Sequence, residues 1–189
     1  MADKHYGMAI DTGRCVGCQT CTVGCKISNE VPGSAQWNHV INLNEDAYIY
    51  QSNGAYPATS LAFRPLLCNH CEDPACVHNC PTGAMHKDAN TGIVSVSQDV
   101  CIACGYCAWV CPYGAPSMDD VHHVMSKCNF CMDRVSEGYV PYCVDGCPAN
   151  ARIFGDLNDP ESDVSKIIAQ KHGMPYKPED GTKPSVYYL

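Results

Sequence analysis

The sequence predicts an α+β fold of two similar units, an inner one inserted into an outer one, with short hairpins, short helices and long loops. Three observations predict it. The sixteen cysteines of the 189-residue chain fall into four groups of four. A Cys-Pro repeat closes three of these groups, at residues 80–84, 111–115 and 147–151. Two brief strand-like segments around a polar, glycine-ended loop at residues 85–96 predict a β-hairpin.

The four cysteine groups have fixed internal spacings. The first reads C-x2-C-x2-C-x3-C, the second C-x2-C-x4-C-x3-C-P, the third C-x2-C-x2-C-x3-C-P and the fourth C-x2-C-x11-C-x3-C-P. In that order they are Cys15, Cys18, Cys21 and Cys25; Cys68, Cys71, Cys76 and Cys80; Cys101, Cys104, Cys107 and Cys111; Cys128, Cys131, Cys143 and Cys147. The third group is the bacterial ferredoxin run. Since one cubane takes four thiolates, the chain is predicted to hold four [4Fe-4S] clusters.

The ferredoxin rule also predicts which cysteines act together. In two-cluster ferredoxins three cysteines of a run hold one cluster, and the fourth ligates the other. Applied here, the rule predicts four ligand sets. Set 1 is Cys15, Cys18, Cys21 and Cys147; set 2 is Cys68, Cys71, Cys76 and Cys111; set 3 is Cys80, Cys101, Cys104 and Cys107; set 4 is Cys25, Cys128, Cys131 and Cys143. Residues 68–115 would then be the inner ferredoxin-like unit, and residues 1–67 with 116–158 the outer one.

Two further segments lie outside the cysteine groups. Residues 26–66 are too long for a ferredoxin loop, so they form either a docking surface or a shield that keeps water from the clusters. Residues 159–189 are predicted to form a helix and a tail. Asp159 before Pro160 is typical of a helix start, and Gly173 of its end. The tail should pack on its own domain or on a partner.

Two other interpretations of the cysteines were weighed. A disulfide scaffold is usual in short secreted chains, but cysteines two residues apart would form strained local bridges. Structural zinc is a more serious alternative for the fourth group, because its spacing resembles a zinc ribbon. Three neighbouring ferredoxin-type groups favour iron–sulfur clusters there as well.

The composition constrains stability and partners. Leu, Ile, Val and Phe make up about 18% of the chain, and the net charge is -8, which would normally indicate disorder. Cluster binding supplies folding free energy, so we expect the metal-free chain to be poorly folded. The acidic balance argues against nucleic acid. No run reaches the length of a membrane span and no leader precedes Cys15, so by itself the chain is expected to be a soluble subunit.

The motifs closely resemble those of a known family. The runs C-N-H-C-E-D-P-A-C at 68–76, C-P-T-G-A-M-H-K at 80–87 and C-P-Y-G-A-P at 111–116 resemble the iron–sulfur subunit of the dimethyl sulfoxide reductase family. The segments at 155–162 and 183–188 resemble its polysulfide, thiosulfate and arsenate reductase branch. Some relatives replace one cysteine of the third group by Trp and carry a three-iron cluster there. This chain keeps all four cysteines, so four cubanes are expected.

The resemblance implies a function in a complex. The chain would be an electron-transfer subunit, not catalytic alone, bound to a molybdenum or tungsten bis-pterin catalytic subunit, often with a quinone-reactive membrane anchor. The complex is expected to be peripheral to the membrane and exported by a twin-arginine leader on the partner, or cytoplasmic if it is soluble. Two alternatives remain: a free-standing polyferredoxin serving several enzymes, and the beta subunit of a soluble transhydroxylase-type enzyme.

A few other residues invite a role. No phosphate loop, G-x-S-x-G or paired-carboxylate signature is present, so we expect no substrate-activating group. His70 and His78 lie between cysteines of the second group and should be hydrogen-bonding or surface residues rather than ligands. Lys127 could raise a cluster's potential, but a solvated surface position is expected for it. Trp109 is expected to pack against the helix that carries the third group.

Overall fold

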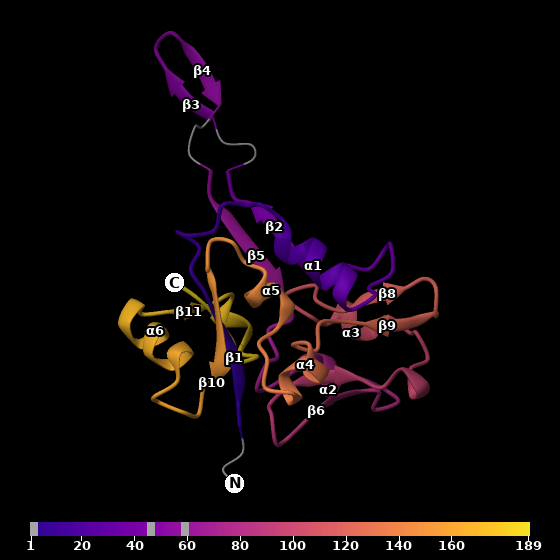
Figure 1. Cartoon of the computed structure of the whole chain (residues 1–189). Coiled ribbons are helices and arrows are strands. Elements are labelled where there is room, and N and C mark those ends of the chain that lie inside the picture. Colours follow the sequence, from indigo (N-terminus) through magenta and orange to yellow (C-terminus); the bar gives the residue numbers. More distant parts are fainter. Residues whose placement is uncertain (1–3, 45–47, 58–60) are drawn as a thin grey trace.

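The computed structural model describes residues 4–44, 48–57 and 61–189. Its largest sheet joins the two ends of the chain (Figure 1). The central strand β1 (Tyr6–Ile10) pairs antiparallel with β10 (Arg152–Asp156) and parallel with β12 (Val186–Tyr188), which pairs antiparallel with β11 (Met174–Pro175). β1 can occupy the centre because Met8, Ala9 and Ile10 form an apolar run that is fully buried. The C-terminal tail therefore packs on its own domain.

The long insertion contains two antiparallel ladders. β2 (Asn38–Asn42) pairs with β5 (Phe63–Leu67), and β3 (Tyr48–Gln51) pairs with β4 (Gly54–Pro57). Figure 1 shows the β3–β4 hairpin apart from the rest of the molecule, whereas Trp37 and Val40 pack against the core. The part around β2 therefore packs on the main core, and its shielding role stays a prediction. The docking role expected for the insertion stays a prediction, and residues 45–47 and 58–60 lie outside the described residues.

Two small hairpins lie next to the middle cysteine groups. β6 (Met85–Lys87) and β7 (Val94–Val96) pair antiparallel, which confirms the hairpin predicted at 85–96. β8 (Ser117–Asp119) and β9 (Val124–Ser126) form a second hairpin that the sequence pattern did not indicate. Its turn depends on a side chain, because the Asp119 carboxylate accepts the N–H groups of Val121 and His122, both at 2.9 Å.

Short helices carry the cysteines. They are α1 (Thr20–Ser28), α2 (Ala75–His78), α3 (Tyr106–Trp109), α4 (Met132–Ser136) and α5 (Tyr142–Asp145), with 3₁₀ turns η1 (Gln98–Val100) and η2 (Pro178–Asp180). α1, α3 and α4 each follow a residue in the left-handed conformation, which turns the chain sharply out of the preceding cysteine loop. α1 packs against α5, and α2 packs against α3. The first group is thereby brought to the fourth, and the second to the third.

The C-terminal helix α6 (Asp163–Lys171) confirms the predicted helix but corrects its start. Its N-cap is Ser162, whose hydroxyl accepts the N–H of Ser165 at 3.2 Å. Asp159 instead accepts the N–H of Glu161 at 2.9 Å, in a turn that precedes the helix. The Asp159-Pro160 signal places the cap three residues too early, because a capping oxygen is available at both positions. At the other end the N–H of Gly173 donates to Ile168, as a helix end requires.

Cysteine side chains make up a large part of the core. The main buried cluster contains four of them, Cys21, Cys68, Cys128 and Cys143, among aliphatic residues from β1, β5 and β12. A smaller cluster is built from Met85, Cys107 and Met125. The apolar interior is thus assembled around thiols, in agreement with the low aliphatic content of the sequence.

Candidate iron–sulfur sites

All sixteen cysteines are free thiols, so the chain is not a disulfide scaffold. Their burial is uneven. Cys18 and Cys104 are exposed, whereas Cys21, Cys25, Cys68, Cys107, Cys128 and Cys143 are buried. Because Cys18 belongs to set 1 and Cys104 to set 3, these two sets lie nearest to solvent.

The thiols of set 1 line a single pocket. Cys15, Cys18 and Cys21 come from the first group, and Cys147 reaches the pocket from more than a hundred residues away. The apolar side chains of Val40 and Pro65 close the pocket from β2 and β5, together with Val16, Pro148, Ala149 and Ala151. The insertion therefore contributes directly to the wall of this site.

Set 3 lines a second pocket of the same kind. Cys101, Cys104 and Cys107 are joined there by Cys80 of the second group. Apolar side chains again surround the thiols: Pro81, Ala84, Met85, Val96, Ile102 and Met125. The β6–β7 and β8–β9 hairpins supply Met85, Val96 and Met125, so the hairpins form the wall of this site.

The thiols of set 2 lie close enough together to act on one another electrostatically. Burial raises the pKa of Cys76 to about 12, and the neighbouring thiols Cys68, Cys111 and Cys71 add to the shift. Burial likewise raises the pKa of Cys71 to about 11, again with contributions from Cys68 and Cys111. Cys111, from the third group, is therefore a neighbour of the first three cysteines of the second group.

Set 4 shows the same relation between the outer groups. Burial raises the pKa of Cys25 to about 12, and the neighbouring thiols Cys143 and Cys131 contribute to the shift. The pKa of Cys128 is also raised well above its usual range, by burial and then by Cys25. Thiols with such raised pKa values are protonated at neutral pH, so metal binding would have to release these protons.

Electrostatic coupling between cysteines links neighbouring sets. Cys21 of set 1 lies near Cys143 of set 4, and Cys128 of set 4 lies near Cys68 of set 2. Set 2 adjoins set 3 across the packed helices α2 and α3. For the predicted ligand sets, these links give the order set 1, set 4, set 2 and set 3, with the two more exposed sets at the ends.

Backbone N–H groups point at the sulfurs. Four donors lie 3.4 or 3.5 Å from a cysteine Sγ: Met85 to Cys80, Met125 to Cys101, Phe130 to Cys128 and Ala151 to Cys147. Hydrogen bonds of this kind favour negative charge on sulfur and belong to the factors that set cluster potentials.

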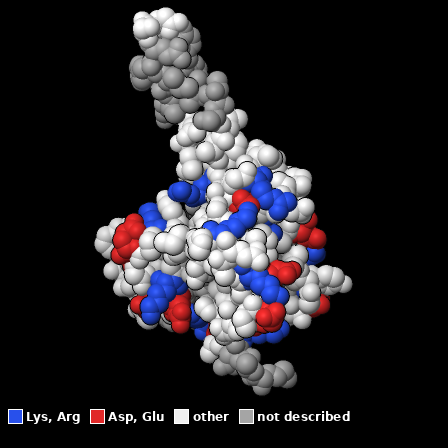
Figure 2. Space-filling view, turned by 90° about the vertical axis from the view of Figure 1, so that its left-hand side faces the viewer, with Lys and Arg blue, Asp and Glu red and all other residues white. Residues whose placement is uncertain are grey.

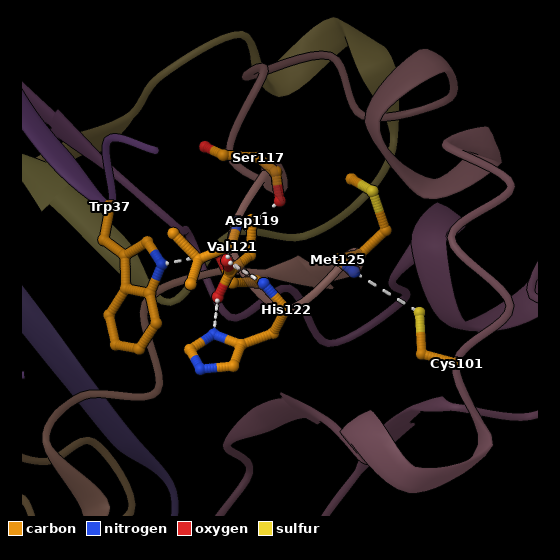
Figure 3. A network of polar contacts seen from close by, with 8 residues as sticks. Trp37, Cys101, Ser117, Asp119, Val121, His122 and Met125 are labelled. Atoms are coloured by element: carbon orange, nitrogen blue, oxygen red, sulfur yellow. Dashed lines mark hydrogen bonds and ion pairs between the residues drawn. The ribbon is translucent and has the colours of Figure 1, made fainter. Parts of the chain in front are cut away.

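The β8–β9 hairpin connects set 3 to the insertion (Figure 3). Trp37 Nε1 donates to Ser126 Oγ at 3.0 Å, while the neighbouring Met125 donates its N–H to Cys101 Sγ at 3.4 Å. The hairpin turn is fixed by Asp119, which also accepts from His122 Nδ1 at 2.8 Å. The unpredicted hairpin thus carries a hydrogen-bond donor to a predicted ligand.

The donor set fits a four-iron cluster. The pockets of sets 1 and 3 each offer four sulfurs among apolar side chains, and the thiols proposed for sets 2 and 4 are buried or partly buried. Among the described residues, no three His, Cys, Asp or Glu side chains converge closely enough to hold a single metal ion. A cubane takes one thiolate on each of four separate irons, so its thiolates lie farther apart than those around one zinc ion. The fourth group is also divided, because its Cys147 lines the pocket of set 1 with three cysteines of the first group.

Four residues can be compared with their expected roles. Lys127 is not solvated: it is 2% exposed, and its Nζ donates to the carbonyls of Val94 and Cys128. Trp109 does not pack in the core and is 79% exposed, because it lies two residues after the inward-facing Cys107 on a short helix. His70 is fully buried and accepts the N–H of Val94 at Nδ1, 3.1 Å away, while His78 is exposed and pairs with Asp73.

Sequence reasoning missed Arg152. This residue lines the pocket of set 1 and donates from Nη2 to Cys21 Sγ at 3.4 Å. A signal was present in the repeat. Five residues after its Cys-Pro cysteine, the second group has Met85 and the third has Pro116, whereas the fourth has a charged residue. A charge at a position that is apolar in the other copies marks a specific contact.

The outer surface adds two observations. On the face shown in Figure 2, basic and acidic side chains are interspersed, and no basic patch gathers there. Within the described ranges, no helix is both long and apolar enough to cross a membrane.

Comparison with known proteins agrees with this geometry. Residues 59–157 match the family described as the 4Fe-4S dicluster domain. Over 98% of its length the chain is 40% identical to the B subunit of sulfite dehydrogenase from Allochromatium vinosum, covering 82% of that protein. It is 39% identical to the B subunit of tetrathionate reductase from Salmonella typhimurium, covering 98% of this chain and 72% of the relative. It is also 39% identical to the B subunit of anaerobic dimethyl sulfoxide reductase from Escherichia coli, covering 89% and 78%.

Proposed function

Because this protein belongs to the iron–sulfur subunits of the dimethyl sulfoxide reductase family and serves in electron transfer, we propose that it holds four [4Fe-4S] clusters as a relay. Sets 1 to 4 are the proposed ligand sets. The observation that carries the proposal is the pocket of set 1, in which three thiols of one group meet Cys147 of another. In the pocket of set 3, Cys80 of the second group joins three cysteines of the third group. This pocket supports the same exchange of the fourth cysteine between groups.

The exchange also supports the nested architecture. The inner unit at 68–115 is closed on itself by sets 2 and 3, and the outer unit at 1–67 and 116–158 by sets 1 and 4. When bound by these cysteines, the clusters would supply one-electron redox chemistry. The chain keeps the sets in a row, surrounds them with apolar side chains and directs N–H groups at the sulfurs.

The two ends of the row are the proposed contacts with redox partners. Beside the exposed thiols, Val16 at the set 1 end is 64% exposed and Ile102 at the set 3 end is 63% exposed. Trp109, Tyr106 and Val100 extend the apolar surface near set 3. Exposed apolar residues that adjoin a functional site are typical of docking surfaces. One end would face a molybdenum or tungsten bis-pterin catalytic subunit, and the other a quinone-reactive membrane subunit or another redox carrier.

The chain is not catalytic alone in this proposal. Substrate chemistry belongs to the pterin-containing partner, as it would also in a soluble complex of the transhydroxylase type. We place the complex at the membrane surface, outside the cytoplasm through a twin-arginine leader on the partner, or in the cytoplasm if the enzyme is soluble.

The test is to express the chain without oxygen, alone and together with the protein encoded beside it. The isolated chain should contain about sixteen irons and no stoichiometric zinc. The pair should copurify with a pterin cofactor, and only the pair should reduce an oxyanion, sulfur compound or sulfoxide with a reduced dye. Zinc in the fourth group, or a three-iron signal in fully loaded protein, would contradict the four cubanes. Turnover by the isolated chain, or no stable association, would contradict the relay.

A further inference from the structure

Arg152 is a buried guanidinium at the start of β10. It is 4% exposed, and its hydrogen-bond acceptors are Cys21 Sγ at 3.4 Å, Asn38 Oδ1 at 2.9 Å and Met8 Sδ at 3.8 Å. Asn38 fixes this arrangement, because its own Nδ2 donates to the carbonyl of Cys21 at 2.9 Å. The guanidinium is therefore held in a defined position against a proposed cluster ligand.

Within the described part of the molecule, no carboxylate neutralises this charge, since the five ion pairs found there involve other side chains. A buried charge is costly unless it is paired, and a guanidinium stays protonated in proteins. Tyr188 is near, but burial raises the pKa of its phenol, which keeps it neutral. The remaining groups that can carry compensating negative charge are thiolates.

Those thiolates belong to two neighbouring sets. Arg152 donates to Cys21 Sγ and lines the same pocket as Cys147, and Cys143 is buried in the same core cluster as Cys21. Cys21 and Cys147 belong to set 1, and Cys143 belongs to set 4. Arg152 thus lies where the first two positions of the proposed relay adjoin.

We propose that Arg152 is a positioning residue that raises the reduction potential of the cluster held by set 1 and, more weakly, that of set 4. Uptake of an electron adds negative charge at the site, and an adjacent buried cation favours that state. The hydrogen bond to Cys21 acts in the same direction and makes set 1 the more sensitive. The inference rests on the proposed function, since it requires clusters at sets 1 and 4.

The test is a redox titration of the full chain, purified without oxygen and followed by electron paramagnetic resonance. In Arg152→Gln, the ratio of reduced to oxidised cluster at the wild-type midpoint of set 1 should fall at least about tenfold, which is 59 mV for a one-electron couple. Arg152→Lys keeps the positive charge but loses the planar guanidinium. The reduction potential of set 1 in this variant should therefore lie between those of the wild type and Arg152→Gln. A merely structural role would leave all four potentials in place.

As a matched control, the same substitution removes another guanidinium, that of Arg64. Arg64 stacks its guanidinium on the rings of Tyr176, 4.8 Å away, and Tyr188, 5.8 Å away. It precedes Pro65, which lines the pocket of set 1, and successive strand residues face opposite sides. Arg64→Gln should therefore leave the potential of set 1 within experimental error. If the reduction potential of set 1 shifts equally in Arg152→Gln and Arg64→Gln, the change in net charge alone explains the shift. That result would overturn the proposal.

Iron content separates this test from that of the proposed function. Wild-type protein without about sixteen irons would contradict the four clusters themselves. A fully loaded Arg152→Gln protein with unchanged potentials would overturn only the role of Arg152. If that variant fails to load, Asn38→Asp decides, because a carboxylate beside the guanidinium should lower the potential of set 1 while Arg152 is kept. An unchanged potential in loaded Asn38→Asp would overturn the role.

Discussion

Cys21 and Cys25 lie one turn apart on α1, and both are buried. Four residues of helix correspond to about 6 Å along the axis, so the two thiols face the same side at different heights. Cys21 lines the pocket of set 1, whereas Cys25 neighbours Cys143 and Cys131. A single helix turn therefore separates two proposed clusters.

This arrangement makes a specific prediction. Cys25→Ser should remove the cluster signal of set 4 and about four of sixteen irons, although the other cysteines of its group remain. Cys21→Ser, one turn away, is the matched control and should remove the signal of set 1 instead. Iron analysis and electron paramagnetic resonance at stepped potentials would measure both. Loss of one and the same signal in Cys25→Ser and Cys21→Ser, with another lost in Cys128→Ser, would refute the exchange.

Single residues also show which features could not be predicted from the sequence. The cysteine spacing is local and carries the candidate ligands, so the sites could be predicted. The burial of Lys127 depends on the carbonyl of Val94, 33 residues away, and no local pattern contains that contact. Trp109 packs on Tyr106 of its own helix, as expected, but it stays exposed because a four-residue helix with Cys107 facing inward has no second buried face.

At the scale of elements, the capping of α6 can be tested. Ser162→Ala removes the hydroxyl that accepts the N–H of Ser165, and should cost about 1 kcal/mol. For a chain of this size that lowers the thermal midpoint by roughly 2–4 °C. The measurement is thermal unfolding of cluster-loaded protein followed by circular dichroism. Asp159→Ala is the control and should have the smaller effect; the reverse order would restore Asp159 as the cap.

Elements were predictable to the extent that their signals were local. The 85–96 hairpin has two short strand-like segments and a polar turn ending in Gly92, and it was found. The β8–β9 hairpin has no glycine in its turn, which relies instead on the Asp119 carboxylate, so this hairpin was missed. The four-stranded sheet joins residues near both ends of the chain. Pairing between strands so far apart in the sequence produces no local sequence pattern.

At the scale of the whole molecule, stability should depend on iron. The main core contains four thiols among eleven buried residues, and aliphatic side chains are few. Chelation of the iron under reducing conditions should abolish the cooperative thermal transition, because the thiol pockets lose the groups that close them. Calorimetry would test this, with mock-treated protein as the control and reductant present to prevent disulfides. A cooperative transition of metal-free protein near the holo temperature would contradict it.

The exchange of thiols between distant groups also constrains biosynthesis. A polypeptide leaves the ribosome at about 5–20 residues per second, so Cys147 emerges roughly ten seconds after Cys21. During that interval the thiols of the first group lack their partners, while sets 2 and 3 are complete once Cys111 has emerged. With the proposed ligand sets, cluster insertion during synthesis would therefore proceed from the inner unit outward. The machinery that delivers iron and sulfide has to keep four early thiols reduced and vacant until the last group arrives.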